Sequence, residues 1–182
     1  VYYRLDESGG PTAADSSGHG VTGTFAAGVE YKVAGILQGD TAVSSSGVVL
    51  TATGLTFPKG TTGLTTELWY LGSANPNRGG TYMSLGSFDL WSGDNGLDIG
   101  DGTRTYQLNR GDLWDGNWHL LDAVDDGSNG SVYMDGQLIW QGAMAFPSGT
   151  NVQVGGTAGE YDEAAVYPKA LTSAQILKHW LY

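Results

Sequence analysis

The sequence contains no cysteine, so disulfides, thiolate metal ligands and a cysteine nucleophile are all excluded. Basic residues are scarce too: eight Lys and Arg stand against 19 Asp and Glu, a formal net charge of −11 at pH 7. A chain with so few, scattered cations is a poor partner for nucleic acid or an anionic membrane surface. The charge is compatible with divalent cations, with neutral glycans or simply with solubility.

Long apolar runs are absent as well, since no stretch of about 18 apolar residues occurs that would insert into a membrane as a helix. The first residues have neither an initiating Met nor the layout of a signal peptide, so we expect a piece of a longer protein. Its 182 residues suit one domain, and we treat 1–182 as a single unit able to bury a core without disulfides.

Glycine, by contrast, is abundant, with 30 residues against five prolines, which indicates many tight turns between short strands. Segments of alternating polarity lie between these turns, and 64–71 is the clearest of them. The other predicted strands are 1–5, 23–27, 48–52, 81–85, 88–91, 103–108, 118–124, 131–134, 137–140, 151–154 and 160–166. About a dozen short strands at this spacing predict an all-β sandwich of two antiparallel sheets.

Two local signals refine this fold. Asp135-Gly136 lies between two predicted strands and favours a type I′ hairpin, whose central positions both need positive φ. At the C-terminal end, Thr172 and Gln175 have the spacing of a capping box, and an apolar stripe follows from Ile176 to Leu181. We therefore predict that one short C-terminal helix docks on the sandwich.

An ordered set of segments carries a family pattern. It comprises 3–10, 14–20 and 23–25 at the start, 67–69, 118–120 and 132–136 in the middle, and 161–167 with 170–172 at the end. This set resembles the laminin-G-like, concanavalin A-like jelly-roll domains of bacterial exoenzymes, adhesins and phage tail proteins. The resemblance implies paired first and last strands. It also implies glycan or protein binding by an appendage of a larger protein that is secreted or on a virion surface.

The same resemblance implies a structural calcium ion between the opening loop and the closing strand. Asp15 and Asp162 stand at the matching places, and Gly18 and Gly20 would offer carbonyl oxygens. The alternative is that Asp15 only forms an Asx-turn and Asp162 pairs with a lysine.

Aromatic residues in Gly/Asp-rich loops suggest a sugar-binding site, because sugar CH faces stack on such rings while planar polar groups bind the hydroxyls. The candidate ligand-binding residues are Trp91, Trp114, Asp94, Asn95, Arg104 and Tyr106. The alternative is that these tryptophans cap the core at strand ends. Trp69, Trp118 and Trp140 lie within strands, so we expect them in the core.

No catalytic constellation emerges from the sequence. The segment 160–164 lacks the third acid of the Glu-x-Asp-x-Glu strand of laminarinase-like enzymes, and Glu163 should face the opposite side of the sheet from Asp162. We therefore predict a non-catalytic extracellular domain that recognises a glycan or host cell-surface component. The alternative is a structural or assembly domain of a phage tail or multidomain secreted protein, in contact with other domains and without a small ligand.

Overall fold

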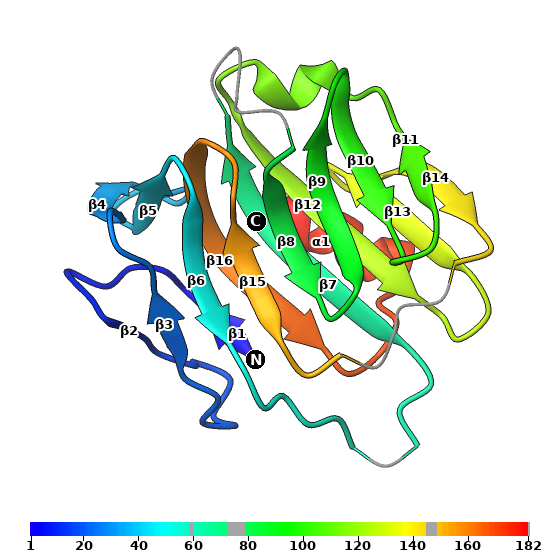
Figure 1. The fold of residues 1–182 in the computed structure, drawn as a ribbon, viewed down its shortest axis with the longest axis horizontal. Coiled ribbons are helices and arrows are strands. Elements are labelled where there is room, and N and C mark those ends of the chain that lie inside the picture. Colours follow the sequence, from blue (N-terminus) through cyan, green and yellow to red (C-terminus); the bar gives the residue numbers. More distant parts are fainter. Residues whose placement is uncertain (59, 73–78, 145–148, 182) are drawn as a thin grey trace.

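The computed structural model describes residues 1–58, 60–72, 79–144 and 149–181. Two antiparallel sheets stack face to face, each with eight strands, as predicted for an all-β sandwich (Figure 1). The helix α1 (Ser173–Trp180) lies behind them in the view of Figure 1. In the described part of the chain, no helix is long and apolar enough to cross a membrane.

Sheet A has the strand order β14-β13-β12-β7-β16-β5-β4, and β1 pairs with a further part of β16. Its strands are β1 (Tyr2–Tyr3), β4 (Glu30–Ala34), β5 (Thr41–Ser45), β7 (Leu64–Leu71), β12 (Trp118–Asp125), β13 (Gly130–Met134), β14 (Gln137–Gly142) and β16 (Gly159–Tyr167). Tyr2 pairs with Ala165, so the first and last strands are neighbours, as the resemblance implies.

Sheet B has the strand order β11-β10-β9-β8-β15-β6-β3-β2. Its strands are β2 (Thr12–Ala13), β3 (Gly23–Phe25), β6 (Val48–Ala52), β8 (Thr81–Leu85), β9 (Phe88–Gly93), β10 (Gly96–Gly100), β11 (Thr105–Gln107) and β15 (Val152–Gly155). A 3₁₀ turn, η1 (Gly111–Trp114), follows β11.

The core fills the space between the sheets, and alternation along each strand decides which side chains enter it. In β7, Leu68 and Tyr70 are fully buried there, whereas Trp69 between them points to the outer face and is half-buried. The expectation that Trp69 belongs to the core is therefore wrong. The buried hydroxyls of Tyr70 and Tyr161 donate to backbone carbonyls at 2.8 and 2.6 Å, which removes the cost of burying them unpaired.

The helix α1 packs on the outer face of sheet A, where Trp180 stacks on Trp69 with ring centroids 5.2 Å apart. The predicted capping box is confirmed, because Thr172 and Gln175 bond each other's backbone N–H. Ile176 is fully buried, but Leu177 and Leu181 are 44% and 73% exposed, so only part of the predicted apolar stripe reaches the sheet.

The predicted hairpin turn is confirmed as well. Asp135 and Gly136 have φ of 55° and 74°, both positive as a type I′ turn requires. Asp135 also accepts a hydrogen bond from the backbone of Leu120 at 3.1 Å and contacts His119 Nδ1 at 2.8 Å. The turn is thereby fixed to the start of β12.

Candidate functional site

A continuous row of polar positions crosses the outer face of sheet B, one from each strand in direct register. We call it the polar row; it runs Thr12, Thr24, Thr51, Gln153, Ser84, Asp89, Gly100, Thr105 from β2 to β11. Strands are about 4.8 Å apart, so the row is roughly 34 Å long. All of its members are exposed or half-buried, and none carries a positive charge.

Asp89 gives the polar row an unsatisfied acceptor at its centre. Thr81 Oγ1 lies 3.4 Å from Asp89 Oδ2, while Oδ1 is buried and has no hydrogen-bond partner in the described chain. Burial raises the pKa of Asp89 to about 6, because water no longer solvates the charged form fully. An unpaired buried acceptor is costly, and the protonated form that the raised pKa favours lowers this cost.

Trp91, a predicted ligand-binding residue, lies beside Asp89 on the same face of β9. It pairs with Thr81 on β8 and with Asp98 on β10, and it is half-buried. Two residues along a strand point the same way, so the indole ring and the Asp89 carboxylate share one surface. A ring next to hydroxyl, amide and carboxylate groups provides the two kinds of contact that sugars make.

The other predicted ligand-binding residues do not gather around Trp91. Asp94 and Asn95 form the exposed turn between β9 and β10, whereas Arg104 lies just before β11, at the opposite end of β10. The four residue steps of β10 separate these groups by about 13 Å. Tyr106 packs on Trp140 with ring centroids 4.8 Å apart, which ties β11 to the edge of sheet A.

Trp114 follows the core-capping alternative. Its ring packs against the core from η1, and its Nε1–H donates to the hydroxyl of Tyr82 at 2.9 Å. The sequence placed Trp114 in a loop rich in Gly and Asp, but the short turn η1 folds that loop back onto the sandwich. The indole N–H is therefore already engaged within the protein.

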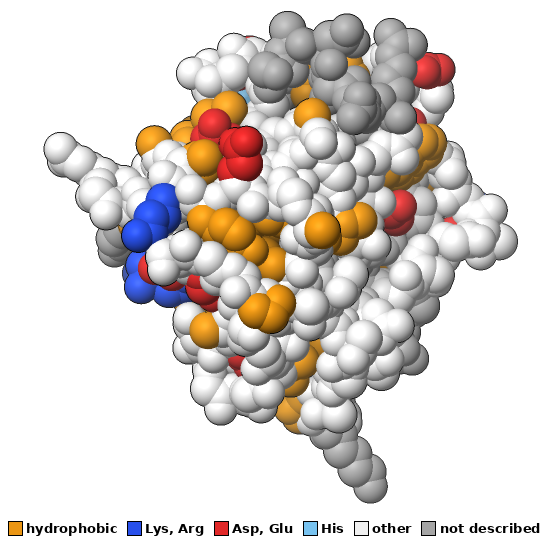
Figure 2. Space-filling view, turned by 60° about the vertical axis from the view of Figure 1, so that its left-hand side comes forward, with side chains coloured by type: hydrophobic (Ala, Val, Ile, Leu, Met, Phe, Trp, Pro, Cys, Tyr) orange, Lys and Arg blue, Asp and Glu red, His pale blue; other side chains and the backbone are white. Residues whose placement is uncertain are grey.

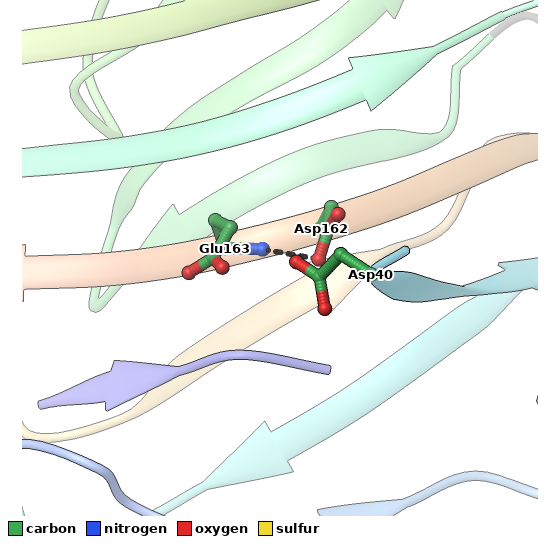
Figure 3. A group of neighbouring side chains, drawn as sticks. All are labelled: Asp40, Asp162 and Glu163. Carbon is green, nitrogen blue, oxygen red and sulfur yellow. Dashed lines mark hydrogen bonds between the residues drawn. The ribbon is translucent and has the colours of Figure 1, made fainter. Parts of the chain in front are cut away.

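A cluster of three carboxylates lies on the other sheet (Figure 3). Asp162 and Glu163 belong to β16, Asp40 precedes β5, and one oxygen of each lies within 4.8 Å of the others. Asp162 accepts hydrogen bonds from the backbone N–H of Glu163 and of Ile36, each at 3.0 Å. The guanidinium of Arg4 approaches Asp40 and Glu163 at 3.8 Å.

The side chains of Glu163 and Asp162 lie on the same side of the sheet, so the prediction from the sequence that they face opposite sides is wrong. A β-bulge between Asp162 and Ala165, with Glu163 at φ 50°, breaks the alternation and brings both carboxylates together. Burial raises the pKa of Asp162 to about 7, and it also raises the pKa of Glu163. Asp40 Oδ2 is buried without a hydrogen-bond partner in the described chain.

Asp15, predicted from the opening loop as a cation ligand, is surrounded by hydrogen-bond donors of the chain itself. Asp15 accepts hydrogen bonds from the backbone of Tyr2, Ser17 and Val21 and from the Ser17 hydroxyl, which is the Asx-turn alternative. Burial alone would raise the pKa of Asp15, but these bonds outweigh it and lower the pKa to about 2. Gly18, at φ 82°, lies exposed in the same turn.

Among the described residues, the trio of possible metal ligands is the cluster around Asp162, and it includes neither Asp15 nor Gly18. Sequence reasoning identified Asp162 but missed Asp40, which precedes a strand that showed no clear alternation. It also missed Asp89, whose importance depends on seven other strands aligning in one register.

The sequence matches no known family model, and no curated protein matches it. Its fold is shared with solved structures. The binding domain of Paraclostridial Mosquitocidal Protein 1 aligns with a TM-score of 0.75 and 12% identity over 99% of this chain and 51% of that chain. The binding domain of botulinum neurotoxin serotype D gives 0.75 and 10%, over 100% and 51%.

A third structure concerns botulinum neurotoxin type C and has a TM-score of 0.69 and 12% identity, over 100% of this chain and 50% of that chain. It is described as showing that cell entry of that toxin depends on interaction with two ganglioside molecules. The chain thus spans about half the length of each of these structures. At such low identity, the likeness shows a common β-sandwich fold.

Proposed function

We propose that this chain is a non-catalytic extracellular recognition domain that binds a neutral, extended glycan along the polar row of sheet B. The observation that carries this proposal is the half-buried Trp91 ring beside the Asp89 carboxylate, on the face where a polar row spans all eight strands. The fold supports the glycan-binding part of the proposal, because two structures that share it are described as binding domains and a third concerns a neurotoxin whose cell entry depends on two ganglioside molecules. Gangliosides are sialylated, so the preference for a neutral glycan rests on the polar row alone.

The geometry of the row suits a chain molecule better than a single sugar. Successive sugars of an extended β-linked glycan advance by a distance similar to the strand spacing of about 4.8 Å. Every strand except β10, where the row has Gly100, would then meet one sugar with a hydroxyl, amide or carboxylate group. Because the row contains no Lys or Arg and includes Asp89, it favours uncharged sugars over sialylated ones.

Hydrolysis of that glycan is not part of the proposal. The two-carboxylate route needs an acid and a base on either side of the scissile bond. Asp98 is the other carboxylate near Trp91 on this face, and it is only 3% exposed. In the carboxylate cluster on sheet A, Asp162 is fully buried and cannot reach a glycosidic bond.

The test is binding of the chain to a panel of neutral and sialylated polysaccharides and gangliosides. We expect a neutral polysaccharide to bind and Trp91→Ala to weaken it about tenfold or more, which equals about 1.4 kcal/mol. Asp89→Asn should weaken it too, while Trp118→Ala, a half-buried tryptophan on the other sheet, should not. Unchanged binding by Trp91→Ala, binding of sialylated glycans alone, or release of sugar products would contradict the proposal.

We also propose a stabilising calcium ion at Asp40, Asp162 and Glu163. Three clustered carboxylates, one with a buried oxygen lacking a partner, supply the hard oxygen ligands that this ion prefers. Calcium should therefore raise the melting temperature of the wild type and leave that of Asp40→Asn unchanged. If chelator and calcium give the same melting temperature in the wild type, this part fails without affecting the glycan site.

One observation favours an assembly role as the second candidate. Leu177 on α1, Leu181 at its C-cap and Leu138 on the neighbouring strand β14 are 44%, 73% and 51% exposed. Exposed leucines grouped on one side mark possible contact surfaces for another domain. This alternative predicts that no glycan binds, and that Leu138→Ser with Leu177→Ser lowers self-association in sedimentation without lowering stability.

A further inference from the structure

A groove of about 500 Å³ lies on the outer face of sheet A, on the opposite side of the molecule from the polar row. It lies between α1, the start of β1 and the segment before β5. Its walls include Tyr2, Ile36, Glu67, Trp69, Glu163 and Tyr167. This volume is within the range of small-molecule sites, which is about 300–1,000 Å³.

The aromatic walls of the groove are held by neighbouring elements. Trp69 on β7 stacks on Trp180 of α1, and Tyr167 on β16 donates its hydroxyl to Glu67 Oε1 at 2.9 Å. Tyr2 on β1 donates its hydroxyl to Glu163 Oε2. Rings fixed in this way cost little entropy when a ligand binds against them.

Two carboxylates line the groove, and protein groups already occupy most of their acceptor positions. Glu67 Oε2 bonds His179 Nδ1 at 2.6 Å in addition to the tyrosine on its other oxygen. No Lys or Arg is among the residues described around the groove. The amino group of Val1 also lines it and donates to the carbonyl oxygen of Val166 at 3.1 Å, while Arg4 reaches Glu163 Oε1 only at 3.8 Å. The groove therefore keeps negative charge but offers few vacant acceptors.

Glu67 is the principal source of this charge. Asp122 lies opposite it on β12 and is fully buried, and burial followed by the nearby Glu67 raises the pKa of Asp122 well above its ordinary value. That shift favours the protonated, neutral form of Asp122. The pair then places one negative charge at the wall of an otherwise largely apolar groove.

From this combination we infer that the groove binds a quaternary ammonium group. Such a cation has no N–H to donate, so it does not need vacant acceptors. It is weakly hydrated, and it is attracted both by fixed carboxylates and by the faces of Trp and Tyr rings. A primary amine would need to displace the tyrosine or histidine from Glu67 or Glu163.

The test uses choline and its neutral isostere 3,3-dimethyl-1-butanol, followed by calorimetry or tryptophan fluorescence. We expect choline to bind with a Kd of about 1 mM or tighter, and the isostere at least about tenfold more weakly. Glu67→Gln should weaken choline binding about tenfold. Because Glu67 also anchors α1 through His179, Glu163→Gln, which lies away from the helix, serves as a second variant and should weaken it severalfold.

Glu160→Gln is the matched control, since Glu160 lies on the same strand but borders a different depression. Three outcomes would overturn the inference. They are equal binding of choline and its isostere, the absence of saturable choline binding, and wild-type choline affinity in both Glu67→Gln and Glu163→Gln. Phosphatidylcholine vesicles then separate two sources of the group: recruitment of the protein assigns a lipid headgroup, and binding of free choline alone assigns a soluble ligand. Glycan binding along sheet B is independent of either result.

Discussion

The buried carboxyl of Asp162 should make the stability of the domain fall as pH rises, and Asp162→Asn should remove the part of that fall that this carboxyl causes. In the folded protein, burial raises the pKa of Asp162 from its ordinary 3.8 to about 7. The folded state therefore holds a proton on this group over a range in which the unfolded chain has already released it. The protonated Asp162 carboxyl contributes its full share to the free energy of unfolding below about pH 4, and this share is lost as pH rises through about 7.

The size of the effect follows from the two pKa values. A difference of one pKa unit corresponds to about 1.36 kcal/mol, so the full loss attributable to Asp162 is about 4 kcal/mol. Between pH 5 and pH 8 the expected share is about 2–3 kcal/mol. That is a substantial part of the 5–15 kcal/mol by which domains are typically stable.

The assay is urea unfolding at pH 5 and at pH 8, with chelator present so that no bound cation stabilises the carboxylate. Asn has only one acceptor for the N–H groups of Ile36 and Glu163, so Asp162→Asn costs about 1–3 kcal/mol at both pH values. The informative quantity is the difference in pH dependence between wild type and variant. If Asp162→Asn keeps the wild-type pH dependence, the reasoning is refuted.

Three further changes probe other contacts. Burial alone would lower the pKa of His119, but hydrogen bonds with two aspartates outweigh burial and raise this pKa. The wild type should therefore gain stability from His119 on going from pH 8 to pH 6, and His119→Gln should lose this gain, as measured by thermal melting. A Cβ on Gly80 would lie 2.1 Å from the carbonyl oxygen of Gly156, so Gly80→Ala should cost about 1–3 kcal/mol. Gly47→Ala, with open space around its Cβ, should change the free energy of unfolding by no more than about 0.5 kcal/mol. Equal urea midpoints for the two variants would show that the close contact at Gly80 does not destabilise the protein. Thr172→Ala removes the helix cap and should cost about 1 kcal/mol in the same assay, whereas no change would mean that α1 is held by packing alone.

Strands that bury one face were predictable from the sequence, because burial requires alternation. The predicted bounds 48–52, 64–71 and 81–85 match β6, β7 and β8. The cap of α1 and the Asp135-Gly136 turn were predictable because each depends on a few adjacent residues.

Strands at the margin were not predictable in this way. β4 is an edge strand whose residues are all exposed or half-buried, so its sequence carries no apolar alternation, and β2 has only two residues. β10 is missing from the predicted strands because it follows its turn so closely, yet most of it is buried between β9 and β11.

The candidate site was predictable only where one strand sufficed. Trp91 lies on an accessible face as expected, but the polar row depends on strand order, which the sequence leaves open. Likewise, the carboxylate cluster combines a bulge in β16 with a loop residue far away in the sequence. A bulge inserts one residue and thereby changes which side chains share a face of the sheet. The alternation of polar and apolar residues in β16 did not predict this bulge.

The edges of the two sheets limit how this domain can associate with other polypeptides. β2 and β11 have two and three residues, and β4 is interrupted by a bulge where Lys32 adopts φ 62°. The fourth edge, β14, has six residues, and its pairing with β13 is also interrupted by a shift in register. Short, bulged or charged edges are poor templates for an incoming strand. Copies at high local concentration should therefore resist fibril-like growth, which makes the domain a suitable scaffold for multivalent display.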